Sequence, residues 1–235
     1  MLLLGTNYGG FKLPEEAREY INKESVVYCV GVGEDMSFDV SLSYETGCTV
    51  NMFDPTPRAI EHAKLIKSFM DNVDENRPND SKRFGGGDKN YLNYLAKHRV
   101  QSDNLKMYDY GLYVKDCKKK FYEPENKDHV SHSLLEKNMS KNYIVVDLKT
   151  LKTVMNELGH DHIDLLKLDI EGVECDVLLQ MFEEEVFPKY VCVDFDSIRK
   201  KLIPKERIEQ CMNAFKTQGY EIFDNNNLDI TFVKN

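Results

Sequence analysis

The sequence of 235 residues contains no run of about 20 apolar residues, the length that a membrane-spanning helix requires. None of its six cysteines belongs to a C-x-x-C pair, so their spacing does not indicate a zinc site. Residues 1–5 are too short and uncharged a run for a signal peptide. We therefore expect a cytoplasmic protein without a membrane span, in a reducing compartment.

Basic residues are outnumbered, with 31 Lys and Arg against 40 Asp and Glu, which gives a net charge of −9. Proteins that coat nucleic acid usually present basic surfaces, so we expect no nucleic-acid partner. An apolar fraction of 41% is enough for a full core. We expect one domain over residues 1–235, in which residues 1–24 form a leader and a helix.

Apolar strand-like runs alternate with helical patterns along the chain. The expected core strands are 26–30, 48–53, 105–112, 163–169 and 190–194. The expected helices are 14–23, 37–46, 57–70, 91–98, 148–158, 173–182 and 205–217. Alternation of this kind predicts an α/β fold with a doubly wound, mostly parallel sheet.

Two further segments complete the expected sheet, and two others interrupt the pattern. Short strands at 220–223 and 228–233 flank a run of asparagines, which predicts a C-terminal antiparallel hairpin and brings the sheet to seven strands. Polar residues dominate 71–90 and 123–142, and three glycines cluster in the first of these segments, so we expect loop excursions in both, with a small extra strand near 119–122.

Two carboxylates, Asp169 and Glu171, lie where the strand at 163–169 ends and a helix begins. Ligands of open α/β sheets bind at the carboxyl ends of the strands. A carboxylate in that position is costly unless it is paired, bound to a metal or used. Helix capping accounts for one of the two acids more readily than for both, so we expect a functional site here.

A glycine turn, Gly31-Val32-Gly33, follows the strand at 26–30. Glycines let the backbone approach a ligand closely. Asp54 ends the next strand, 21 residues after Gly33, a spacing at which an acid binds the two hydroxyls of a ribose. The pattern predicts a nucleotide-type cofactor on this edge.

Dinucleotides and S-adenosylmethionine both fit this geometry. A dinucleotide fingerprint has a third glycine, and Met36 stands at that position. The C-terminal hairpin adds an antiparallel strand that typical dinucleotide domains lack. Both features favour S-adenosylmethionine, which has no pyrophosphate.

Several segments resemble the FkbM family of class I methyltransferases, which have a Rossmann-like fold. The resemblance is carried by residues 27–35 and 166–174, the second of which contains Asp-Ile-Glu-Gly. Residues 110–113, 120–122 and 130–133 resemble the central block of that family, and residues 5–11 resemble a leader found in some members. The similarity extends over residues 5–195.

The resemblance implies transfer of a methyl group from S-adenosylmethionine, usually to oxygen, on a sugar, a glycan or a glycosylated small molecule. One departure concerns the fifth strand, where family members often carry Glu-Phe-His and this chain carries Asp194-Phe195-Asp196. A catalytic histidine is therefore absent from that position.

Further residues complete the expected cofactor site. We expect Gly31 and Gly33 to pass under the methionine part and Asp54 to hold the ribose. The remaining cofactor contacts are expected from Glu34, Asp109, Tyr110, Gly111 and Asp169.

A sugar hydroxyl is a weak nucleophile at neutral pH and needs a general base or a metal ion. Asp169, Glu171 and His132, within Val-Ser-His-Ser, are the candidates for catalysis.

Mg²⁺ or another divalent ion is the alternative aid to catalysis, because it prefers oxygen ligands. Asp169, Asp194 and Asp196 are its candidate ligands, at the ends of two adjacent expected strands. In the competing interpretation, Asp194 and Asp196 only form a strand-end loop.

Other functions remain open at this stage. A protein or nucleic-acid methyltransferase is one, although the chain has neither an Asn-Pro-Pro-Tyr motif nor a Pro-Cys nucleophile. A non-catalytic module that keeps the methyltransferase fold is another, and a dehydrogenase is a distant one.

Overall fold

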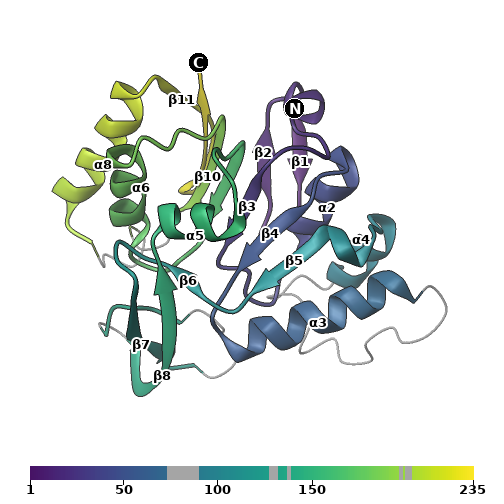
Figure 1. Cartoon of the computed structure of the whole chain (residues 1–235), viewed down its shortest axis with the longest axis horizontal. Helices are drawn as coiled ribbons and strands as arrows, with labels where there is room; N and C mark the ends of the chain where they lie inside the picture. The colour runs from purple at the N-terminus through teal and green to yellow at the C-terminus, as the bar shows by residue number, and fades with distance from the viewer. Residues whose placement is uncertain (73–89, 127–131, 137–138, 196–197, 199–202) are drawn as a thin grey trace.

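The computed structural model describes the chain except for residues 73–89, 127–131, 137–138, 196–197 and 199–202 (Figure 1). Its main sheet has seven strands in the order β11-β12-β10-β9-β3-β4-β5. β3, β4, β5, β9 and β10 pair in parallel, whereas β12 is antiparallel to both β10 and β11. The strands are β3 (Val27–Val30), β4 (Val50–Phe53), β5 (Leu105–Tyr108), β9 (Leu165–Leu168), β10 (Tyr190–Asp194), β11 (Tyr220–Asn226) and β12 (Asp229–Lys234). The expected α/β class with a mostly parallel seven-stranded sheet is therefore confirmed.

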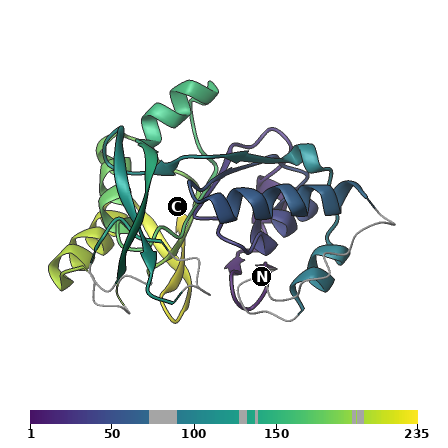
Figure 2. The same ribbon diagram turned by 90° about the horizontal axis from the view of Figure 1, so that it is seen from below.

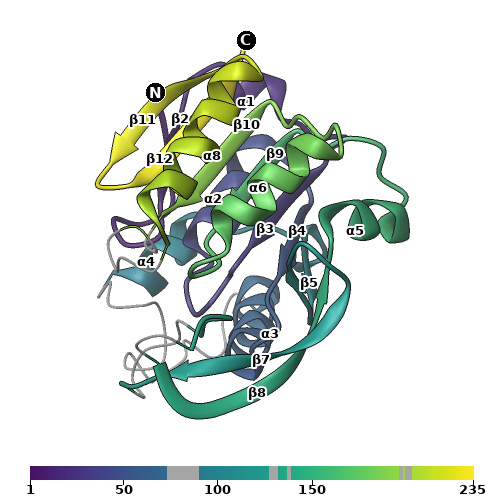
Figure 3. The same ribbon diagram turned by 90° about the vertical axis from the view of Figure 1, so that its left-hand side faces the viewer.

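Helices cover both faces of this sheet (Figure 3). They are α1 (Ala17–Tyr20), α2 (Ser37–Thr46), α3 (Pro57–Asp71), α4 (Tyr91–Lys97), α5 (Leu151–Leu158), α6 (Glu174–Glu183) and α8 (Lys205–Thr217). Alternation along β3 separates two cores, since successive side chains of a strand point to opposite faces. Val27 and Cys29 pack with α2, α3 and α4, while Tyr28 and Val30 pack with α5, α6 and α8. No helix of the described residues is both long and apolar enough to cross a membrane.

The order of the strands reverses next to β3. From β3 the sheet extends to β4 and β5 on one side, and the chain then returns to place β9 and β10 on the other. The carboxyl ends of β3 and β9 therefore lie side by side at the point of reversal. Such a point leaves a crevice in which ligands of open α/β sheets bind.

The region between β5 and α5 differs from the expectation. The strand expected at 105–112 is split into β5 and β6 (Gly111–Leu112). β6 joins β7 (Cys117–Pro124) and β8 (Met139–Lys149) in a second sheet of order β6-β8-β7. Figure 2 views the molecule from the end where β7 and β8 lie. The expected loop at 123–142 thus holds the ends of two strands, and the one expected at 71–90 falls almost entirely outside the described residues.

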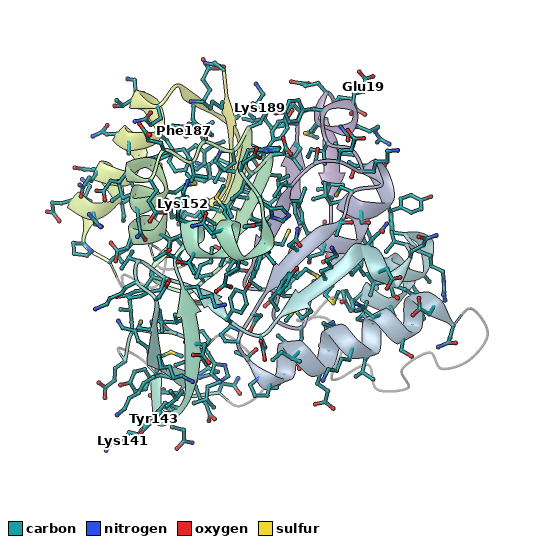
Figure 4. All side chains as sticks on the ribbon, in the orientation of Figure 1. Glu19, Lys141, Tyr143, Lys152, Phe187 and Lys189 are labelled. Atoms are coloured by element: carbon teal, nitrogen blue, oxygen red, sulfur yellow. The ribbon has the colours of Figure 1, made fainter. Side chains whose placement is uncertain are left out.

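Leu148 belongs to β8 and not, as expected, to the following helix. Along β8 the side chains alternate: Val146 and Leu148 are buried, whereas Tyr143 and Val145 are exposed. Figure 4 shows Tyr143 at the surface. The helix begins only after Thr150, whose hydroxyl accepts a hydrogen bond from the Thr153 N–H at 3.1 Å. This cap sets the boundary that apolar spacing alone placed too early.

The N-terminal leader contains a hairpin that was not expected. β1 (Leu2–Leu4) and β2 (Phe11–Leu13) pair antiparallel, and the helix expected at 14–23 is the four-residue α1. Leu2, Leu4, Phe11 and Leu13 are buried in the core that contains α2, whereas Leu3 is exposed. The N–H of Gly5 donates to Ser41 Oγ of α2 at 2.9 Å. The leader is therefore part of the folded domain.

Candidate active site

A cavity of about 520 Å³ opens at the carboxyl ends of β3, β4, β9 and β10. Its walls come from the turn after β3, the ends of the other three strands, the segment before β8 and the turns of both terminal hairpins. The residues expected in the cofactor and catalytic sites that line it are Gly31, Val32, Gly33, Glu34, Asp54, Gly111, His132, Asp169, Glu171 and Asp194. The cavity thus lies at the point where the strand order reverses.

The turn after β3 needs its glycines. Gly31 and Gly33 have φ angles of 79° and 56°, in the left-handed region that side chains disfavour. The Gly33 N–H donates to Asp54 Oδ2 at 2.9 Å. The other oxygen, Oδ1, accepts from the Thr56 N–H and hydroxyl at 2.8 and 2.7 Å. Oδ2 keeps one lone pair, so Asp54 can both hold the turn and accept a hydrogen bond from one ligand hydroxyl.

Glu34 lies at the rim of the cavity, held by α3. The guanidinium of Arg58 donates to it twice, from Nε to Oε1 at 3.0 Å and from Nη2 to Oε2 at 2.7 Å. In the 109–111 stretch, Gly111 lines the cavity, whereas Asp109 is exposed and Tyr110 packs in the core near Phe53. Asp109 and Tyr110 therefore do not line the cavity as expected cofactor contacts would.

Asp169 lies beside a buried lysine. Lys167 Nζ is 4.0 Å from Asp169 Oδ2 and 3.5 Å from the carbonyl oxygen of Gly31. Burial of Lys167 disfavours its charge, but attraction to Asp169 and Asp39 outweighs burial and raises the lysine pKa. Burial also raises the pKa of Asp169 well above its usual value, and Asp194 adds to the rise while Lys167 opposes it. The site therefore holds a carboxylate that takes up a proton more readily than an ordinary aspartate.

The Asp-Ile-Glu-Gly turn carries the segment that contains His132. Glu171 and Gly172 both have positive φ angles, of 52° and 117°. Ser133 Oγ donates to the carbonyl oxygen of Glu171 at 2.7 Å and accepts from the Leu135 N–H at 3.0 Å. These bonds fix the chain next to His132 on the turn that follows Asp169, and the His132 imidazole lines the cavity.

The described residues of this site include no set of donors for a metal ion. Asp194, at the end of β10, lines the same cavity as Asp169, but Asp196 lies outside the described residues. Within the described parts of the chain, no three His, Cys, Asp or Glu side chains gather closely enough to hold a metal ion. No chemical step is therefore assigned to Mg²⁺.

Both ends of the chain supply cavity residues that the sequence did not predict. Asn7 and Tyr8 come from the turn between β1 and β2, whereas Asn226 and Asp229 are the paired end residues of β11 and β12. Burial, together with repulsion by Asp169, raises the pKa of Tyr8. The signals available in the sequence were the glycines around Tyr8 and the run of asparagines, both typical of turns.

Comparison with known proteins identifies the family of this chain. A family model described as the methyltransferase FkbM domain matches residues 25–221. No curated protein and no solved structure gave a significant match. The match covers the glycine turn, Asp54, the His132 segment and Asp169. The protein therefore contains a methyltransferase domain and belongs to the FkbM methyltransferase family.

Proposed function

We propose that the protein transfers the methyl group of S-adenosylmethionine to a hydroxyl of a sugar, a glycan or a glycosylated small molecule. The observation that carries this proposal is one cavity that is lined by the glycine turn, Asp54, Asp169 and His132 together. Such an arrangement suits a cofactor and an acceptor that meet at Asp169.

The cofactor side has features that suit S-adenosylmethionine. The glycine turn at the end of β3 lines the cavity, and the remaining lone pair of Asp54 Oδ2 suits a hydroxyl of a ribose. Phe53, Leu112 and Leu148 give the cavity an apolar wall that suits a purine. When bound, S-adenosylmethionine supplies an electrophilic methyl group.

Asp169 is the proposed general base. A hydroxyl must lose its proton as it attacks, and a base works best when its pKa approaches the working pH. The raised pKa of Asp169 moves the carboxylate in that direction, while Lys167 keeps the ionised form accessible. His132 is the second candidate, because its ring lines the same cavity.

The fold is proposed to be a doubly wound, Rossmann-like sheet with a C-terminal hairpin. The two cores on opposite faces of β3 and the reversal of strand order beside it support this assignment. The antiparallel pairing of β11 with β12 supports the hairpin.

Two measurements test the proposed function. Titration with S-adenosylmethionine and S-adenosylhomocysteine, followed by calorimetry, should show binding of both. Incubation with methyl-labelled cofactor and a panel of methyl glycosides should yield labelled sugars. Asp169→Asn should abolish transfer while cofactor binding persists, and Asp161→Asn, a change at an exposed site, is the matched control.

Three results would contradict the proposal. Absence of cofactor binding would favour a non-catalytic module with this fold. Label recovered in protein or nucleic acid but not in sugar would favour the other acceptor classes. Full activity of Asp169→Asn would remove the aspartate from proton transfer.

A further inference from the structure

A second cavity of about 230 Å³ adjoins the first, and we name it the side cavity. Both cavities are lined by Asn7, Asn226 and Asp229, so they meet at these three residues. Leu3 and Lys12 line only the side cavity. Its volume is below the roughly 300–1,000 Å³ of pockets for drug-sized ligands, so it suits one small group such as a single sugar ring.

The two terminal hairpins build the side cavity together. β2 lies beside β11 and β12 (Figure 3). Lys12 Nζ of β2 binds Asp224 of β11, at 3.1 Å from Oδ1 and 3.4 Å from Oδ2. This ion pair is partly buried, with the two side chains 33% and 23% exposed. The ion pair therefore connects two walls of the side cavity whose residues are 212 positions apart in the sequence.

The turn at the junction of the cavities has an uncommon backbone. Asn227 and Leu228 have φ angles of 54° and 81°, a region that bulky side chains such as leucine rarely adopt. The Leu228 carbonyl accepts from the Phe195 N–H at 3.1 Å, which holds the turn against the end of β10. Strained backbone of this kind is often found at functional sites. Here the turn places the paired residues Asn226 and Asp229 at the junction of the two cavities.

The chemistry of the side cavity suits an uncharged polyhydroxylated ring. The amides of Asn7 and Asn226 both donate and accept hydrogen bonds, and the carboxylate of Asp229 accepts them. Among the residues that line the cavity, Lys12 is the cationic one, and Asp224 already neutralises it. An anionic group such as a phosphate would therefore meet no cationic side chain in the lining except Lys12, which Asp224 already pairs.

We propose that the side cavity binds a second sugar ring of the acceptor, so that the enzyme methylates a chain or glycoside of at least two rings and not a free monosaccharide or a nucleotide sugar. This inference rests on the proposed methyl transfer to a sugar. The ring that receives the methyl group lies beside Asp169, and the next ring extends between Asn7 and Asn226 into the side cavity.

The test compares acceptors that differ only in the second ring. Methyl glycosides of common hexoses and deoxyhexoses are assayed beside the methyl disaccharides that end in the same rings, and beside uridine diphosphate hexoses. We expect kcat/KM for the preferred disaccharide to exceed that for its monosaccharide by at least about tenfold. Nucleotide sugars should be no better than monosaccharides.

Variants of residues that line the side cavity test whether this cavity causes the preference for disaccharides. Leu3 is 54% exposed, so Leu3→Trp should fold normally and fill the cavity. It should reduce the ratio of disaccharide to monosaccharide kcat/KM to about one, and Asp224→Asn should reduce it in part. Glu221→Gln removes one charge from the same strand outside both cavities and should leave the ratio unchanged.

Each outcome is informative. Methyl transfer to sugars with equal kcat/KM for one and two rings would overturn the side-cavity proposal and leave the proposed function intact. The same holds for a disaccharide preference that Leu3→Trp does not reduce. Absence of transfer to any sugar by a protein that binds the cofactor would overturn the proposed function, and the side-cavity assignment with it.

Discussion

The carbonyl oxygen of Asp169 occupies the space next to Gly31 in which a side chain would begin. A Cβ atom at Gly31 would lie 1.7 Å from that oxygen, far inside van der Waals contact. The glycine turn and the acid proposed to face the acceptor are thus packed backbone against backbone. The closeness of β3 and β9 at this point depends on the absence of a side chain.

Gly31→Ala should therefore abolish cofactor binding and lower the free energy of unfolding by about 3 kcal/mol or more, because the clash with Asp169 adds to the cost of a positive φ. The matched control is Gly47→Ala, since Gly47 has a φ of 72° and nothing within 4 Å of the added carbon. Its cost should be about 1 kcal/mol. Urea denaturation of both variants measures the difference, and equal losses would contradict the close packing.

Asp54→Asn should weaken S-adenosylmethionine binding by about tenfold or more, because a charged acceptor of hydroxyl hydrogen bonds becomes a neutral amide. The amide oxygen can still accept one of the present bonds, so the protein should remain folded. Calorimetric titration of the purified variant gives the affinity, and Glu61→Gln on the surface of α3 is the control. Unchanged affinity would show that Asp54 serves only to hold the glycine turn.

The pH dependence of methyl transfer should report on Asp169. The base must be ionised, so kcat/KM should fall on the acid side with an apparent pKa above the ordinary value of about 3.9. Lys167 lowers the pKa of Asp169, so its removal in Lys167→Met should raise that pKa and move the acid limb to higher pH. Lys118→Met, at a side chain 71% exposed, should not move the limb. A limb shifted to lower pH in Lys167→Met would contradict the role of Asp169 as base.

Ser133→Ala tests whether the segment before β8 must be fixed on the Asp-Ile-Glu-Gly turn. The substitution removes the donor to the Glu171 carbonyl and the acceptor of the Leu135 N–H, and a bond lost at this buried site costs about 1–3 kcal/mol. We expect kcat to fall more than cofactor affinity, because the loosened segment carries His132. Ser140→Ala, in an exposed part of β8, is the control. Equal losses of kcat and affinity would indicate general loosening of the site.

Local patterns predicted the helices and the central strands well. The helices expected at 37–46 and 205–217 have the boundaries that the structure shows, because signals for helix ends are local, such as Gly47 after the first helix and Pro204 before the second. Leu148 was assigned to a helix because a leucine three residues before Leu151 fits a helical face as well as a strand. Only the pairing of β8 with β6 and β7 decides between them, and that pairing is not local.

In the candidate site too, local patterns predicted some residues, whereas others depend on contacts between distant parts of the chain. Gly31, Asp54 and Asp169 each follow a central strand, so the general rule for parallel sheets was enough to expect them at one edge. Tyr8 and Asn226 reach the cavity from hairpins at opposite ends of the chain. The three-residue strands β1 and β2 carry too little periodicity to be recognised, and what buries them is contact with α2.

The buried His62 of α3 should make stability depend on pH in a defined direction. The Met36 N–H donates to Tyr91 Oη at 3.0 Å, which leaves the phenol hydrogen for His62 Nε2 at 2.8 Å. Burial lowers the pKa of His62 from 6.5 to about 4. Between these values the unfolded chain binds a proton that the folded protein does not, so stability is lost as the pH falls.

His62→Gln should therefore remove a loss of about 3 kcal/mol that the unsubstituted protein suffers between pH 6.5 and pH 4. Glutamine can accept the Tyr91 hydrogen but does not titrate, so the difference between the two unfolding curves isolates the histidine from the carboxylates that titrate in the same range. His162, paired with Asp161, has a raised pKa and is exposed, so His162→Gln should give a small difference of opposite sign. Identical pH slopes for the unsubstituted protein and His62→Gln would show that His62 is protonated in the fold, and the bond from Tyr91 would then have to be reversed.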